Sequence, residues 1–291
     1  MSYFKGTGIQ LAKQSLAILK EKRSLFIFPL LSAICLITLY FAVLIPLFKI
    51  EANAWLHPGS VNKTTFVIFY LALLALFFVS HLITIVFNTG LTSCTIKHIK
   101  GEPYTISSGF KTMIFRFPLL YLWTTLMTSL GAYVRLVEYW SDNWPTFRFA
   151  TDTLAGLPWL KATFFMTPVL TIEKINPWHA IKRSAHLFKN TWGTSVVAKT
   201  CIKRITFPLR GIAFLPALIV VIIGGKTVLI IGGITTSIMF LSISTVVAAL
   251  NCTLTSALYL HATGVNVSAF YDIALLKDAF QPIPPKKNPL K

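Results

Sequence analysis

Glu173 is the residue whose type and position best suit it for chemistry, because it ends an apolar run and precedes a strongly basic segment. The chain has 27 Lys and Arg but only 9 Asp and Glu, so this carboxylate is expected to be ionised and paired, with Arg183 or Arg116 as the partner. A proton-relay carboxylate is the alternative interpretation. Membrane-embedded hydrolases and transferases need clustered carboxylates, histidines or an activated nucleophile. The scattered acidic residues supply no such cluster, so the sequence predicts no enzyme, no catalytic residue and no cofactor.

Other single residues are weaker candidates. His81 lies deep in an apolar run, where an ionisable side chain suggests function, although a hydrogen bond to a neighbouring hydroxyl also explains it. Lys161 is either a buried counter-charge or a lysine that extends to the interface. Pro168 interrupts its run and has a structural role. Four cysteines show no CxxC spacing, so neither a disulfide nor a metal site is indicated.

The basic segment itself predicts a surface helix over 177–190. Asn176 and Pro177 form a helix start, since Asn caps free N–H groups and Pro suits the first position. Its apolar face is predicted to comprise Trp178, Ile181, Ala185 and Phe188, beside a basic face of His179, Lys182, Arg183, His186 and Lys189. Such a helix either lies on an anionic membrane surface or covers other helices. The residues expected to contact lipid headgroups or a partner are Trp178, His179, Lys182, Arg183 and Lys189.

Composition defines the class of protein. The chain is 55% hydrophobic and 12% charged, with a mean hydropathy of +0.69, which is too apolar for a soluble core of this size. We therefore expect an all-α integral membrane protein. The net charge of +18 fits headgroup contact and topology signals, and no nucleic-acid partner is expected.

Six apolar runs predict about six crossings within a single polytopic domain over 1–280. The fourth run is interrupted by Gly156, Pro158, Lys161 and Pro168, which predicts a broken or re-entrant helix. The runs are Leu25–Phe48, Thr65–Phe87, Phe117–Val134, Leu154–Ile172, Phe207–Ile223 and Val228–Leu260. They form three hairpins at about 25–94, 113–172 and 207–260, with cytosolic amphipathic helices at about 8–22, 104–112, 177–190 and 268–280. Residues 281–291 read as a flexible basic tail.

Internal repetition supports this scheme. Phe-Pro-Leu occurs at 28–30, 117–119 and 207–209, each time at the start of an odd-numbered run, where Pro suits a first helical turn. A segment at 88–101 matches 251–264 at a constant offset of 163, and 9–20 matches 178–189 at an offset of 169. We therefore predict three repeated helical hairpins, of which the middle copy has diverged most.

The distribution of charge predicts orientation. Of the 27 Lys and Arg, 21 fall in the N-terminal segment, the 95–116 and 173–210 loops and the C-terminal tail, 5 fall on the other side, and Lys161 lies within the fourth run. Because cytosolic loops carry the excess of basic residues, both termini are expected in the cytosol of a bacterial inner membrane.

Specific stretches also carry a resemblance. These are Phe164–Glu173, with Pro168 five residues before the carboxylate, then Ala180–Ser184 and Thr191–Gly193. Here the chain resembles a family of uncharacterised six-helix membrane proteins of prokaryotes, and it is distantly similar to the membrane domain of glycerophosphodiester phosphodiesterases. The resemblance implies the fold but brings no activity and no catalytic residues.

Two functions are compatible with these patterns. The first is a non-enzymatic multi-pass membrane protein that organises lipid or partner proteins at the cytosolic face. The second is a transporter or channel subunit with a site between the repeated hairpins. The expected partner is a bilayer with anionic headgroups, and a membrane-protein partner or a homo-oligomer remains open.

The predicted topology can be tested by cysteine labelling in sealed cells. Probes at Ser60, Asn143 and Gly225 should react with an impermeant reagent from outside, whereas probes at Glu102, Ser184 and Lys286 should not. The reason is the charge asymmetry, which keeps the basic loops inside. Strong external labelling at position 184 would contradict this orientation.

Overall fold

The computed structural model describes residues 2–56, 63–141, 157–192 and 226–277. Within these ranges all regular structure is helical and no strand occurs. The predicted fifth run at 207–223 and the tail at 281–291 lie outside the described residues.

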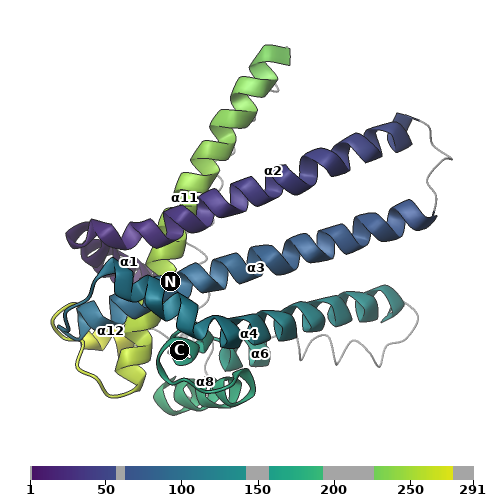
Figure 1. Ribbon diagram of the computed structural model, residues 1–291. Coiled ribbons are helices and arrows are strands. Elements are labelled where there is room, and N and C mark those ends of the chain that lie inside the picture. The colour runs from purple at the N-terminus through teal and green to yellow at the C-terminus, as the bar shows by residue number, and fades with distance from the viewer. Residues whose placement is uncertain (1, 57–62, 142–156, 193–225, 278–291) are drawn as a thin grey trace, which may run out of the picture.

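Four long helices dominate the described structure. They are α2 (Ile27–Leu56), α3 (Lys63–Ile99), α4 (Ile106–Ser141) and α11 (Lys226–Ala262). The four helices meet at one end and spread apart at the other (Figure 1). Each contains a segment long and apolar enough to cross a membrane, namely Arg23–Val43 (which begins ahead of α2), Val67–Ile99, Ile106–Tyr133 and Ile238–Ala262. The described chain is therefore an all-helical protein with four candidate membrane spans.

Short elements surround the end where the long helices meet, which we call the base. They are α1 (Ser2–Glu21), the 3-10 helix η1 (Arg23–Phe26), α6 (Leu157–Ala162), α7 (Met166–Ile172), α8 (Pro177–Trp192) and α12 (Ile273–Lys277). The N-terminal ends of α2 and α4 and the C-terminal ends of α3 and α11 enter the base (Figure 1). We call the outer parts of the four long helices the arms.

Apolar side chains are buried in the base but exposed on the arms. In the base, Leu91, Phe165 and Leu258 are buried. On the arms, Phe41 is 61% exposed and Ile68 57% exposed. Large apolar side chains gain nothing from contact with water, so the arms have the surface expected of helices that face lipid.

Two expectations about the elements are met. The fourth run is broken into α6 and α7 by a turn at Thr163–Phe165. Pro29 lies in the first turn of α2. α11 has 37 residues, or about 55 Å at about 1.5 Å per residue, which exceeds a bilayer core of about 30 Å. Its last turns pack into the base, where Leu258 and Tyr259 are buried.

Other expectations were wrong. The amphipathic helix predicted at 104–112 is not separate, because α4 runs without a break from Ile106 to Ser141 with Pro118 inside it. The helix predicted at 268–280 is reduced, within the described residues, to Ile273–Lys277. In α4, packing along α3 outweighs the single backbone hydrogen bond that Pro118 removes.

Three helices that end in the base are followed by a left-handed residue. Gly101 (φ 74°) follows α3, Lys174 (φ 52°) follows α7 and Gly264 (φ 80°) follows α11. After α3, the Glu102 N–H donates to the Lys97 carbonyl at 2.9 Å, and after α11 the Val265 N–H donates to the Leu260 carbonyl at 3.0 Å. These two bonds are related by the offset of 163 found in the sequence. A left-handed residue satisfies the free carbonyls of a helix end, so both ends stop by the same device.

Phe28 holds α2, α3 and α4 together in the base. Its ring is fully buried and packs on Phe110 with the ring centroids 5.2 Å apart. A Cβ at Gly90 would lie 2.7 Å from the ring, and a Cβ at Gly109 would lie 2.5 Å from it. The two glycines therefore provide the space that Phe28 occupies, because any side chain there would displace the ring.

Gly109→Ala should lower the melting temperature in detergent micelles, with a loss of about 1–3 kcal/mol, because overpacking forces a buried ring to move. Gly131→Ala in the same helix is the matched control, since nothing lies within 4 Å of its added Cβ and Ala favours a helix over Gly. Adding Phe28→Leu to Gly109→Ala should recover part of the loss. Equal melting temperatures for the two alanine variants would contradict the role given to Phe28.

Candidate functional site

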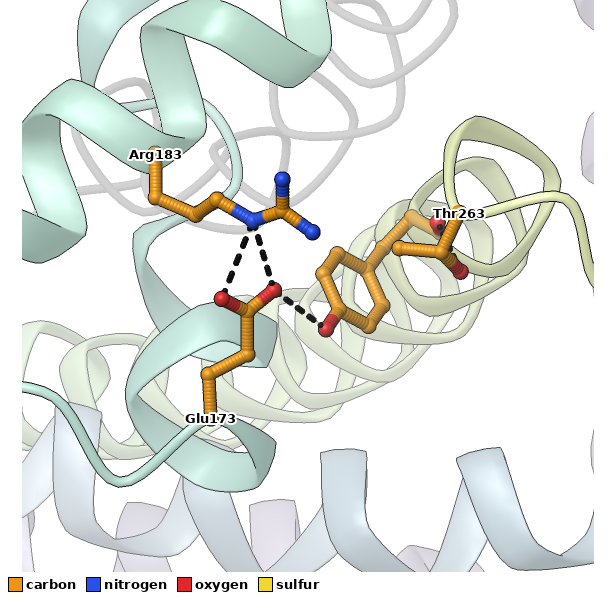
Figure 2. A network of polar contacts seen from close by, with 4 residues as sticks. Glu173, Arg183 and Thr263 are labelled. Atoms are coloured by element: carbon orange, nitrogen blue, oxygen red, sulfur yellow. Dashed lines mark hydrogen bonds and ion pairs between the residues drawn. The ribbon is translucent and has the colours of Figure 1, made fainter.

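The link between α7 and α8 forms a polar junction at the base. α7 ends at Ile172, and Lys174 then adopts a left-handed conformation that redirects the chain. Asn176 caps α8, since its Oδ1 accepts the His179 N–H at 3.1 Å. The predicted start of α8 at Asn176-Pro177 is confirmed, and the Glu173 side chain is left between α8 and α11 (Figure 2).

Glu173 binds two side chains from different helices. Arg183 Nε donates to Glu173 Oε1 at 3.1 Å and to Oε2 at 3.0 Å, and the Tyr259 hydroxyl donates to Oε1 at 2.9 Å. Figure 2 shows the carboxylate of Glu173 facing the guanidinium group of Arg183. The side chain of Glu173 is 20% exposed and that of Arg183 is 41% exposed. The expected ion pair is present, with Arg183 as the partner, and partial exposure makes it weaker than a fully buried pair.

Arg116, the other expected partner, has a different role. Its Nε donates to the Thr171 carbonyl at 3.0 Å, and its Nη2 donates to the Ile172 carbonyl at 3.2 Å. These carbonyls end α7 and have no partner within the helix, and the C-terminal end of a helix attracts cations. Arg116 is only 9% exposed. It therefore joins α4 to the end of α7 immediately before Glu173.

The inner face of α8 is fixed to the base by polar and aromatic contacts. Ser184 is fully buried, and its Oγ accepts the Phe165 N–H at 3.0 Å. The rings of Phe165, Phe188 and Trp192 pack on one another. Trp192 Nε1 donates to the Leu276 carbonyl at 3.1 Å, which joins α8 to α12.

The outer face of α8 carries most of its cations. Its exposed residues are Trp178, His179, Lys182, Arg183, His186, Lys189 and Asn190. Lys182 Nζ lies 5.7 Å from the centroid of the Trp178 ring, within the range of a cation–π contact. Four residues expected to contact headgroups thus remain accessible, whereas Arg183 is engaged by Glu173.

The apolar face predicted for α8 was wrong in part. Trp178 is 61% exposed, but Phe188 is 3% exposed and lies in the aromatic cluster. The inner face is formed by Ala180, Ser184, Leu187 and Phe188, so it is rotated relative to the prediction. The physical reason is the Ser184 hydrogen bond, which a helical projection cannot anticipate. A labelling probe at Ser184 would be hidden by protein, so Lys182 is the better probe of sidedness.

The remaining sequence candidates do not join this junction. His81 lies in α3 and stacks on Phe77, with the ring centroids 6.4 Å apart. No described residue hydrogen-bonds to its Nε2, so the expected hydroxyl partner is missing at that atom. Lys161 is in the last turn of α6. Pro168 is buried in the first turn of α7, where it costs no hydrogen bond.

Sequence analysis missed Tyr259, Ser184 and Trp192 as parts of the junction. Trp192 was within a stretch that carried the family resemblance, which was the only signal for it. Tyr259 is 86 residues from Glu173, and no local pattern links them. Within the described ranges no three His, Cys, Asp or Glu side chains come together, and the junction has the chemistry of a clamp that joins helices.

The fold and the junction define a class: an all-helical protein with four candidate membrane spans, whose helices are joined at the base by a carboxylate clamp. This clamp is Glu173 with its two donors, Arg183 and Tyr259. The chain belongs to a family of unknown function, DUF6159, which matches residues 67–277. This match includes α3 from residue 67 onward and all of α4, α7, α8 and α11, and therefore the four residues of the junction, Arg116, Glu173, Arg183 and Tyr259. No match was found among curated proteins or solved structures. The expected likeness to glycerophosphodiester phosphodiesterase membrane domains is therefore without support.

Glu173→Gln should lower the melting temperature in detergent, with a loss of about 1–3 kcal/mol in the free energy of unfolding. The substitution removes the negative charge that Arg183 and Tyr259 bind, and hydrogen bonds to a charged group contribute about this amount. Arg183→Gln should cost a similar amount, and the double variant should cost less than the sum, since the two groups contact each other. Glu102→Gln is the matched control, because Glu102 is 53% exposed and lies 3.9 Å from Lys100. Strict additivity, or a neutral Glu173→Gln, would contradict the clamp.

Proposed function

We propose that this chain is a non-enzymatic, multi-pass protein of the bacterial inner membrane that organises anionic lipid at the cytosolic face through α8. Six crossings arranged as three hairpins, with both termini in the cytosol, complete the proposal. The fifth crossing is assigned to 207–223, outside the described residues, and the fourth to the segment broken into α6 and α7.

The arrangement of helix ends supports this orientation. The ends of α2, α3, α4 and α11 that meet in the base are those that the charge asymmetry assigns to the cytosol. The arms, with their exposed apolar side chains, then lie in the bilayer. A base at the cytosolic surface places α8 within reach of headgroups, because α4 and α11 continue from the base into candidate spans.

Matching helix ends support the hairpin repeat. α3 and α11 end with a glycine of positive φ at positions related by the same offset of 163. α7, which ends the middle hairpin, is also followed by a left-handed residue, Lys174. The middle copy thus shares the left-handed residue but not the glycine, in line with its divergence in sequence.

The observation that carries the proposed lipid contact is the outer face of α8. Lys182 and Lys189 are exposed, seven residues apart, and therefore lie along one stripe. Trp178 is exposed beside Lys182, and Trp favours the boundary between headgroups and acyl chains. Each cation near an anionic membrane contributes about 1 kcal/mol. The inner contacts of Ser184 and Trp192 hold this face outward, so the helix loses little conformational freedom when it binds lipid.

The test is the melting temperature of the purified chain in neutral detergent with added phosphatidylglycerol or phosphatidylcholine. A ligand that binds the folded state raises its stability, so phosphatidylglycerol should raise the melting temperature more than phosphatidylcholine. Lys182→Gln with Lys189→Gln should remove a large part of this difference, and added salt should weaken it by screening.

A charge-matched control separates the site from general charge. Lys63→Gln with Lys226→Gln changes the first residues of α3 and α11, at the ends away from the base, and should leave the phosphatidylglycerol effect intact. Equal effects of the two lipids on the unmodified chain would overturn the proposed function. If the Lys182→Gln, Lys189→Gln variant kept the full rise in melting temperature with phosphatidylglycerol, α8 would not be the lipid-binding surface.

A further inference from the structure

α1 and α8 are exposed in the same pattern along their aligned lengths. At the offset of 169 that relates their sequences, each residue from 10 to 20 falls in the same exposure class as its equivalent from 179 to 189, except Gln14. The residue equivalent to Gln14 is Arg183, whose side chain forms the ion pair with Glu173. Sequence similarity between these helices is therefore accompanied by the same choice of inner and outer face.

Equivalent inner residues fix both helices to the base. Ser15 and Ser184 are each fully buried, and the equivalent residues Leu19 and Phe188 are 0% and 3% exposed. Ser15 Oγ and the Tyr271 hydroxyl lie 2.7 Å apart, whereas Ser184 accepts a backbone N–H. Burial raises the pKa of Tyr271, so this group stays a neutral phenol able to hydrogen-bond. The partners differ, but one buried serine orients each helix.

Equivalent outer residues place two lysines in one stripe on each helix. Lys13 and Lys20 of α1 are exposed at the positions of Lys182 and Lys189. No carboxylate in the described part of the chain lies within ion-pair distance of Lys13 or Lys20. Two unpaired cations, held outward on a fixed helix, are complementary to an anionic surface.

We propose that α1 is a second headgroup-binding surface, in which Lys13 and Lys20 bind phosphate groups of anionic lipids as Lys182 and Lys189 do on α8. This inference rests on the proposed function, because it gives α1 the same ligand as α8. α1 leads through η1 into the candidate span Arg23–Val43, so it is also adjacent to the bilayer.

The two surfaces engage separate lipids. α1 lies beside the start of α2 and α8 lies below α4, apart from each other on the base (Figure 1). Sites that share no partners contribute additively. The chain therefore contacts the anionic leaflet at two points, which fixes the base against the surface more firmly than one helix can.

The experiment uses the full chain in neutral detergent and measures the rise in melting temperature produced by phosphatidylglycerol. Lys13→Gln with Lys20→Gln should lose roughly half of this rise, a share similar to that lost by Lys182→Gln with Lys189→Gln. The quadruple variant should lose the sum of the two. Without lipid all three should melt close to the unmodified chain, because exposed substitutions have small effects.

The outcomes separate this inference from the proposed function. Loss in the α8 variant with no loss in the α1 variant overturns the second surface and leaves the function standing, and no loss in either overturns both. The Lys63→Gln, Lys226→Gln variant controls for net charge. Inorganic phosphate at the same concentration should give no rise, and an equal rise with phosphate would overturn binding to lipid.

Discussion

The carboxylate of Glu173 is the group on which the base depends. It lies directly after Ile172, the last residue of α7, and accepts hydrogen bonds from Arg183 on α8 and from Tyr259 on α11. Arg116 from α4 binds the two carbonyls immediately before it. Three consecutive residues, 171–173, thus join four helices. A charged acceptor with oriented donors tolerates little displacement, so these contacts fix where α8 begins relative to α4, α7 and α11. The buried Ser184 hydrogen bond then sets which face of α8 is turned outward.

The same long helices serve two environments. In the arms they present apolar side chains, whereas in the base they bury apolar residues together with small hydroxyl groups. Ser93 of α3 bonds Thr112 of α4 at 3.1 Å, and Thr92 of α3 lies 3.0 Å from Cys252 Sγ of α11. Small polar residues let helices approach closely and still satisfy their side chains. The ring of Phe28 between Gly90 and Gly109 adds a shape-specific contact, so the base has the packing of a protein core.

Segments whose sequences match at a constant offset have similar local structure in some places and different packing in others. The turns after α3 and α11 share φ sign and hydrogen bonding, and α1 and α8 share buried and exposed positions. By contrast, Phe28 is fully buried while Phe117, at the equivalent place in the second Phe-Pro-Leu motif, is 45% exposed. The proposed function accounts for this difference, because two equivalent helices that face an anionic surface are useful only if both keep their outward lysines.

By itself the sequence determined the helical class, the approximate position of each described long helix and the start of α8 at Asn176-Pro177. These features depend on the length of apolar runs and on the conformations open to Asn and Pro, which are local properties. Tertiary structure decided that Arg183 and not Arg116 pairs with Glu173, that Tyr259 joins them, that the inner face of α8 contains Ser184 and Phe188, and that residues 106–141 form one helix. Each of these outcomes depends on distances between residues far apart in the chain or on packing that outweighs a local proline. No spacing along the sequence records such distances, so they are settled only when the helices meet.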